Sequence, residues 1–317
     1  MIVSREITLT HKVTYLLKNK IFIICFFSFC KILNIQAIQN SAREAGKFKW
    51  QVITNAADPQ IDFLRENKLI YALELSLNEY KNINLVNPQK KSTKLDANLP
   101  GQLHVTVVID VFRVFTTASY VLGCNPTAYI ITTKSAVISR LALNFQNPLL
   151  IGKAEIGAKL AYDIPNSPTR AEEVAITGRA VLHRTEAGAR GIFLARESDI
   201  ILVAGFVNAE ATAEYIRKLD NPNITLIPMG HEAITPSLED HVCAMYIAAL
   251  INEKKVNIEN FIPILRKGPG RYFFSEDQWQ YPHEDFKRCL ETGRYRFAIQ
   301  AIVKNDYAIL TRCEQNS

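Results

Sequence analysis

Acidic and basic side chains follow several apolar runs of this sequence, in places where they could bind a metal ion and an anion. Asp110 lies near the end of the run LHVTVVIDV at 103–111, and Arg113 comes three residues after it. A carboxylate there could hold a metal ion or attack phosphorus, and the planar guanidinium of an arginine could clamp an anion. The structural alternative is that Asp110 only binds the N-terminus of the next helix.

A second candidate region lies around Glu155, which follows a short apolar run and has a glycine on either side. The turn NSP at 166–168 comes soon afterwards. Serine before proline is a favoured pair at the start of a helix, so helix capping alone explains this turn. Substrate binding by Asn166 and Ser167 is the alternative interpretation.

A third region is HRTEAGARG at 183–191, where a predicted strand leads through a glycine-containing turn into a helix. Backbone amides around Gly188 could form an anion nest, and Arg184 and Arg190 flank it. No Gly-Lys-Ser/Thr follows, so the segment is not a Walker loop. The structural alternative is a glycine turn with solvated arginines.

Two further places carry candidate ligands. Asn208 fits the capping position before a helix, and a cap alone explains it. Glu239 and Asp240 follow Ser237 in the first turn of a later helix, where carboxylates interact favourably with the helix dipole. Carboxylates are also the ligands that Mg²⁺ prefers, so this pair is a candidate for metal binding.

The elements that must position these residues alternate between strand and helix. This order predicts a layered α/β/α fold with a mostly parallel or mixed sheet. In such sheets ligands bind beyond the carboxyl ends of the strands, which is where the candidate residues lie. The patterns predict strands at 103–111, 129–132, 149–151, 179–183, 199–204 and 224–229, and helices at 115–122, 135–144, 189–195, 209–219 and 238–251.

Residues 1–100 are interpreted as an N-terminal extension and residues 101–317 as the α/β domain, with a polar linker at 86–101. The apolar run at 21–30 follows several lysines, as in a secretory signal or a membrane anchor, but it is short for a membrane span. An amphipathic extension and a translated leader are the other interpretations. Membrane contact is expected only through residues 1–38, and the expected location is otherwise the cytoplasm.

Charge and cysteine usage narrow the class of protein further. The net charge is +6, and residues 1–100 contain 14 Lys+Arg against 8 Asp+Glu, which accounts for the whole excess. A neutral α/β domain argues against a broad nucleic-acid surface but allows a local cationic pocket for a small anion. None of the six cysteines forms a CxxC pair, so a zinc ribbon or a dense disulfide framework is not expected.

The ordered set of these motifs resembles the 2-phosphosulfolactate phosphatase family. The resemblance runs from about Val105 to Cys313. It implies a compact α/β fold and a magnesium-dependent phosphatase that hydrolyses (2R)-2-phospho-3-sulfolactate to sulfolactate and phosphate, a step of coenzyme M synthesis in some organisms. The motifs are VVIDVFR at 107–113, Glu155, NSP at 166–168, Arg184-Thr185 with Ala187-Gly188, FVNA at 206–209, Glu239-Asp240 with Cys243-Ala244, and DFKRCL at 285–290.

The residue types and the resemblance together give a predicted site for a small anionic phosphoester. The segments 154–156 and 184–189 depart from the pattern of many family members, so a non-catalytic or altered-specificity anion-binding paralogue is the alternative. The oligomeric state stays open. The predicted catalytic residues are Asp110, Arg113 and Glu155, the substrate-binding residues Asn166, Ser167, Arg184, Thr185, Gly188, Arg190 and Asn208, and the Mg²⁺ ligands Asp110, Glu239 and Asp240.

Overall fold

The computed structural model describes residues 102–153, 155, 157 and 159–313, the segment 82–86, and positions 69, 70, 73, 74, 77 and 88. The chain divides into two compact units, 1–59 and 60–317, and every described residue belongs to the second. The predictions for the apolar run 21–30 and for membrane contact through 1–38 therefore lie outside the described residues. Among the described helices, none combines the length and apolar character needed to cross a bilayer.

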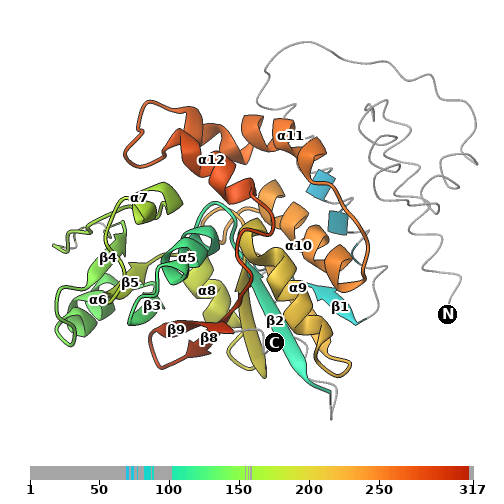
Figure 1. The fold of residues 1–317 in the computed structure, drawn as a ribbon, viewed down its shortest axis with the longest axis horizontal. Coiled ribbons are helices and arrows are strands. Elements are labelled where there is room, and N and C mark those ends of the chain that lie inside the picture. Colours follow the sequence, from blue (N-terminus) through green and yellow to red (C-terminus); the bar gives the residue numbers. More distant parts are fainter. Residues whose placement is uncertain are drawn as a thin grey trace, which may run out of the picture. The chain divides into compact units, whose positions relative to one another are not determined.

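The described residues form a nine-stranded sheet in the order β1-β7-β2-β6-β8-β9-β3-β5-β4, with helices packed against it (Figure 1). The sheet has two parallel groups, in which β1, β7, β2 and β6 lie on one side and β3, β5 and β4 on the other. The strands are β1 Ile83–Leu85, β2 His104–Ile109, β3 Ala128–Thr132, β4 Leu149–Gly152, β5 Ala180–Arg184, β6 Ile200–Ala204, β7 Asn223–Pro228, β8 Ala298–Val303 and β9 Ala308–Cys313.

The antiparallel hairpin of β8 and β9 joins the two parallel groups, because β8 pairs with β6 and β9 pairs with β3. This hairpin makes the sheet mixed, so the predicted α/β fold class is confirmed. The sequence patterns did not identify the hairpin. The last two strands of the chain thus lie inside the sheet rather than at its edge.

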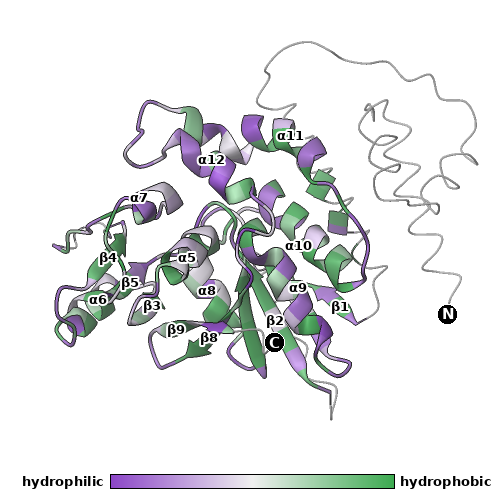
Figure 2. Cartoon of the chain, viewed as in Figure 1, coloured by the Kyte–Doolittle hydropathy of each residue, from purple (hydrophilic) through white to green (hydrophobic). Residues whose placement is uncertain are grey.

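The helices follow the strands much as the sequence patterns predict. The interior strand β2 is buried along its whole length, as expected for a strand covered on both faces, and it is hydrophobic over most of its length in Figure 2. The helices are α5 Val114–Gly123, α6 Ser135–Ala142, α7 Pro168–Glu172, α8 Ala187–Leu194, α9 Ala209–Arg217, α10 Leu238–Ile251, α11 Ile262–Lys267 and α12 His283–Leu290.

The sheet begins upstream of the predicted boundary at residue 101. Strand β1 pairs with β7, so residues 83–85 belong to the same unit as the rest of the sheet. Leu73 and Leu77 are helical and buried, which indicates that apolar packing also extends to this upstream stretch. The predicted boundary at 100–101 thus lies within the unit 60–317.

Helix α12 lies at the same end of the molecule as α7 and packs against it (Figure 1). Phe286, Cys289 and Leu290 are buried, and their spacing of three and four residues puts them on one face of the helix. Asp285, in the first turn of this helix, is also fully buried although it carries a carboxylate. A buried carboxylate needs polar partners, and these partners define much of the candidate site.

Candidate functional site

Asp110 follows the last residue of β2 and is buried. Its backbone amide donates to Ala204 O at 3.2 Å, which continues the ladder to β6. Its Oδ1 accepts the amide of Val114 at 3.2 Å, the first residue of α5. Asp110 therefore binds the N-terminus of the next helix, which is the structural role considered for it, and it uses one of its two carboxylate oxygens to do so.

Asp240 ties together the loops that follow β2 and β7. Its Oδ1 accepts the amide of Val111 at 2.8 Å, and its Oδ2 accepts the amide of Gly230 at 2.7 Å. Burial raises the pKa of Asp110, and the negative charge of Asp240 raises it further. Burial also raises the pKa of Asp240, although its two backbone amides partly oppose this shift. Two buried carboxyl groups thus interact at the carboxyl end of β2.

Glu239 does not complete a three-carboxylate cluster with this pair. Among the described residues, no group of three or more His, Cys, Asp or Glu side chains is arranged to hold a metal ion. The physical reason lies in helix geometry, because successive residues of α10 point about 100° apart around the helix axis. Asp240 points toward the loop after β2, so its neighbour Glu239 points elsewhere.

Arg113 is buried and forms an ion pair with Asp285, with 2.5 Å between Nη1 and Oδ2. The guanidinium also lies over the ring of Tyr281, 4.9 Å from its centroid, and 5.6 Å from that of Phe273. Among the described residues, its Nε and Nη2 have no hydrogen-bond partner. Arg113 thus contributes a charge close enough to Asp110 to lower that carboxyl group's pKa, against the larger effect of burial.

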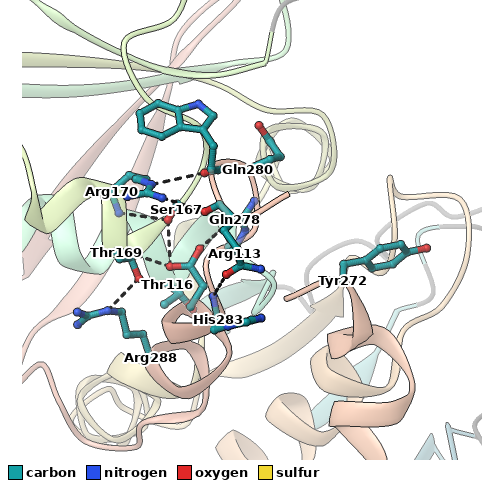
Figure 3. Close-up of polar contacts among 12 residues, drawn as sticks. Arg113, Thr116, Ser167, Thr169, Arg170, Tyr272, Gln278, Gln280, His283 and Arg288 are labelled. Carbon is teal, nitrogen blue, oxygen red and sulfur yellow. Dashed lines mark hydrogen bonds and ion pairs between the residues drawn. The ribbon is translucent and has the colours of Figure 1, made fainter. Parts of the chain in front are cut away.

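The predicted turn at 166–168 contacts Asp285, which is the ion-pair partner of Arg113. Ser167 donates its hydroxyl to Asp285 Oδ1 at 3.0 Å, and the amide of Thr169 donates to the same oxygen at 2.9 Å. Ser167 also accepts the amide of Arg170, so its predicted capping role is confirmed. In Figure 3, Arg113, Ser167 and Thr169 lie close together, and a dashed line joins the Thr169 side chain to Arg288. The buried Oδ1 of Asn166 has no hydrogen-bond partner among the described residues.

Arg184, the last residue of β5, hydrogen-bonds the residues that follow β3 and β4. Its Nε donates to Thr133 O at 3.0 Å, its Nη1 donates to Lys153 O at 3.2 Å, and its Nη2 pairs with Glu186 at 3.1 Å. Arg190 also pairs with Glu186, at 2.5 Å, and is more than half exposed. The two arginines predicted to bind substrate thus contact carbonyl groups and a carboxylate of the chain itself.

Glu155 belongs to the network of Arg184. Its Oε2 accepts the amide of Ser135 at 2.8 Å, at the start of α6, and its Oε1 lies 3.7 Å from Arg184 Nη2. The hydrogen bonds from Ser135 lower the pKa of Glu155, so the carboxylate form is favoured. In this arrangement Glu155 supports a helix start next to β4 and β5.

Gly188 lies within a helix rather than in the predicted turn. Helix α8 begins at Ala187, one residue before Gly188. A Cβ atom at Gly188 would lie 2.8 Å from Val114 Cγ1 and 3.1 Å from Phe115, so the missing side chain allows α8 to start against α5. The amide of Thr185 donates to Thr132 O at 3.0 Å. The first turn of α8 is therefore brought next to the residues that follow Asp110.

Asn208 is fully buried and uses its side-chain amide on the backbone. Its Oδ1 accepts the amide of Gly205 at 3.0 Å, and its Nδ2 donates to Val203 O at 3.1 Å. Asn208 occupies the position before α9, but its side chain makes no capping hydrogen bond there. The side chain shapes the loop after β6, which accounts for the residue without a substrate contact.

Seven of the predicted residues thus fall into two groups. Asp110, Arg113 and Asp240 lie around the loop after β2, and Ser167 joins them through Asp285. The second group lies at the ends of β3, β4 and β5 and consists of Glu155, Arg184 and Arg190, with Glu186 between them.

His183, on β5, lies close enough to Arg113 to be affected by its charge, although no site role was predicted for it. Its Nδ1 lies 2.7 Å from the Tyr129 hydroxyl, the two rings stack, and its buried Nε2 has no hydrogen-bond partner among the described residues. Burial lowers the pKa of His183 to about 3, and the charge of Arg113 contributes to the shift. The signal in the sequence is a histidine at the end of the apolar run RAVLH.

The neutral state of His183 predicts an acid-dependent loss of stability. The imidazole has a pKa of 6.5 when unperturbed and about 3 in the folded chain, so protons bind preferentially to the unfolded chain in this range. The contribution of neutral His183 to the free energy of unfolding is constant above pH 6.5 and is lost as the pH falls toward about 3. For His183→Gln, we expect the free energy of unfolding to fall less steeply with acid than for the wild type, by up to about 1.4 kcal/mol per pH unit.

Urea unfolding of both chains between pH 7 and pH 4 measures this difference. The exposed His283 gives a matched control, because His283→Gln should leave the pH dependence of the wild type unchanged. Equal slopes for wild type and His183→Gln would show that His183 is not held neutral by its surroundings.

The fold and the site define an α/β protein with a buried carboxyl pair and a buried arginine at the carboxyl end of the interior strand β2. A family model described as 2-phosphosulpholactate phosphatase matches residues 89–264. The chain belongs to the 2-phosphosulpholactate phosphatase family, and the resemblance found in its motifs is confirmed.

Several curated proteins named "Probable 2-phosphosulfolactate phosphatase" are similar to this chain. The protein of Caldicellulosiruptor saccharolyticus is 32% identical over 160 residues, which cover 49% of this chain and 63% of that protein. The protein of Bacillus subtilis is 27% identical over 211 residues, with 65% of this chain and 90% of that protein covered. For the protein of Clostridium botulinum (strain Alaska E43) the identity is 26% over 157 residues, 49% of this chain and 65% of that protein.

Proposed function

We propose that this chain is a phosphatase that hydrolyses a small acidic phosphoester, with (2R)-2-phospho-3-sulfolactate as its substrate. The observation that carries the proposal is the buried ensemble of Asp110, Asp240 and Arg113 at the carboxyl end of β2. A substrate with several negative charges needs cationic partners in a site that excludes water. Membership of the family and the names of the similar proteins support the same activity.

A magnesium ion fits the donors of this site. Asp110 and Asp240 offer carboxylate oxygens, and burial raises both pKa values, so a divalent cation beside them would stabilise their ionised forms. Mg²⁺ retains several waters, so two carboxylates suffice to hold it. When bound there, Mg²⁺ would supply charge neutralisation at the phosphoryl group. Glu239 is left out of this proposed ligand set because it does not cluster with the other two carboxylates.

The chain's own residues would bind the phosphoryl group and transfer the proton that the reaction moves. Arg113 holds the phosphoryl oxygens with its remaining N–H groups. A water oxygen forms a bond to phosphorus, the bond from phosphorus to the ester oxygen breaks, and the leaving oxygen takes a proton to become the alcohol. Asp110 has a pKa raised by burial, which suits a group that accepts or returns a proton near neutral pH. Direct attack by Asp110 on phosphorus is the alternative route.

Phosphate release from a panel of small phosphorylated acids tests the proposal. The panel contains phosphosulfolactate, phospholactate and phosphoglycerate, each with Mg²⁺ and with a chelator. We expect release from phosphosulfolactate that depends on Mg²⁺ and exceeds release from the other acids. Absence of phosphate release from every member, with a folded protein, would contradict the proposed function.

A second candidate function is anion binding without hydrolysis. The observation that favours it is the occupation of Arg184 by two carbonyl groups and Glu186, since this arginine was expected to bind substrate. The same panel separates the two functions when binding is measured by calorimetry alongside release. Tight binding of phosphosulfolactate without turnover, with Mg²⁺ present, would support this second function.

A further inference from the structure

Asp285 holds together three parts of the site but lies outside the matched region of the family model, which ends at residue 264. It comes from α12, 172 residues after Arg113 in the chain. Its Oδ2 binds Arg113, and its Oδ1 accepts hydrogen bonds from Ser167 and from the amide of Thr169. Both carboxylate oxygens are therefore engaged and the charge of Asp285 is paired with that of Arg113, which leaves no unpaired negative charge there for a metal ion.

We propose that Asp285 is a positioning residue that fixes the guanidinium of Arg113 for binding a phosphoryl group. The inference deepens the proposed function and rests on it. In this arrangement Asp285 acts only through Arg113, by holding Nη1 and leaving Nε and Nη2 for the ligand. The rings of Tyr281 and Phe273 restrict the same guanidinium from another direction.

The burial of this ion pair supports a role beyond stability. The side chains of Arg113 and Asp285 are 5% and 0% exposed, so both have lost nearly all of their hydration. A buried ion pair often contributes no more stability than an apolar pair of the same size. The charges of Arg113 and Asp285 have a use if the guanidinium is held in a fixed orientation beside Asp110. Binding sites need groups that are held in place before the ligand arrives.

The contacts of Asp285 also join the arginine to α7. Ser167 is the capping residue of α7, and Thr169 is the second residue of that helix. Asp285 therefore couples the position of Arg113 to the turn that carries Asn166, whose Oδ1 is buried without a partner among the described residues. The C-terminal segment that contains α12 is thus required to complete the site.

The test measures binding of inorganic phosphate to the full chain by calorimetry, in the presence of Mg²⁺. The variants are Asp285→Asn and the double variant Arg113→Gln/Asp285→Asn, which leaves no unpaired buried charge. We expect Asp285→Asn to weaken phosphate binding by about tenfold or more, and the double variant to weaken it by less than about threefold further. Glu173→Gln is the matched control, because it breaks the exposed ion pair with Arg170 and should not change the affinity.

Electrostatics alone predicts the opposite result for Asp285→Asn. Removing a negative charge close to an anion site would leave phosphate binding unchanged or strengthen it. Unchanged or tighter binding would therefore overturn the positioning role, as would a double variant far weaker than Asp285→Asn. Lack of phosphate binding by the wild type would overturn it too. If the expected affinities are found but phosphosulfolactate is not hydrolysed, the positioning role stands and the proposed function fails.

A milder variant keeps the inference testable if Asp285→Asn does not fold, which circular dichroism would show. Ser167→Ala removes one of the three contacts of Asp285 and leaves the ion pair intact. We expect it to weaken phosphate binding by about twofold to fivefold, because Arg113 is then held less firmly. Wild-type affinity in folded Ser167→Ala would contradict the role of Asp285 in that case.

Discussion

Replacing Asp110 by asparagine is expected to lower kcat/KM for phosphosulfolactate by about 10³-fold or more, because the variant loses the carboxylate proposed to act at the phosphoryl group. Asparagine keeps the Oδ1 that accepts the amide of Val114, so the turn into α5 is preserved. Steady-state phosphate release with Mg²⁺ measures the effect. Activity within about tenfold of the wild type would remove Asp110 from the chemistry.

Stability separates a chemical effect of Asp110→Asn from unfolding. Burial and the charge of Asp240 raise the pKa of Asp110, so its ionised form is disfavoured in the folded chain at neutral pH. A neutral side chain avoids that cost, and we expect the variant to melt at or above the wild-type temperature in the presence of a chelator. Asp306→Asn, in the exposed turn between β8 and β9, is the matched control and should keep full activity.

Replacing Gly152 by alanine is expected to destabilise the fold by about 3 kcal/mol or more, since it combines backbone strain with a steric clash. Gly152 ends β4 with φ of +137°, and a Cβ atom there would lie 2.4 Å from the carbonyl oxygen of Arg184. Relief of the clash requires β4 to move away from β5, to which it is paired. The movement would also disturb the contact of Arg184 with Lys153.

Urea unfolding of Gly152→Ala and Gly178→Ala separates the two causes. Gly178 also has a positive φ, +79°, but nothing lies within 4 Å of a Cβ atom placed there. Gly178→Ala should therefore cost only about 1 kcal/mol, which is the strain of the left-handed conformation. Equal losses for the two variants would show that the contact with Arg184 is not what makes glycine necessary at 152.

Local patterns in the sequence predicted most of the elements that carry the site. Strands and helices from β2 to α10 follow the predicted ranges closely, because alternating apolar runs and caps are local signals. The strand order is not local, and the hairpin of β8 and β9 enters the middle of the sheet from the end of the chain. Nothing in its own residues indicates which strands it joins.

The site shows the same division between local and distant information. Asp110 and Arg113 were identified because polar residues after a buried strand are conspicuous. Asp285 is visible in the sequence only as part of the motif DFKRCL, since its contact with Arg113 spans 172 residues. Asn208 was predicted to bind substrate, but an amide that hydrogen-bonds the backbone inside a loop has the same sequence appearance as one that binds a ligand.

A crystal structure of the full chain with Mg²⁺ and orthovanadate, an analogue of the phosphoryl group in transfer, tests the central claim most directly. We expect a metal ion bound by a carboxylate oxygen of Asp110 or Asp240, and vanadate within hydrogen-bond distance of Arg113. Vanadate bound elsewhere, for example beside His104 at the opposite end of β2, would contradict the proposed site even if the crystals contain both ions.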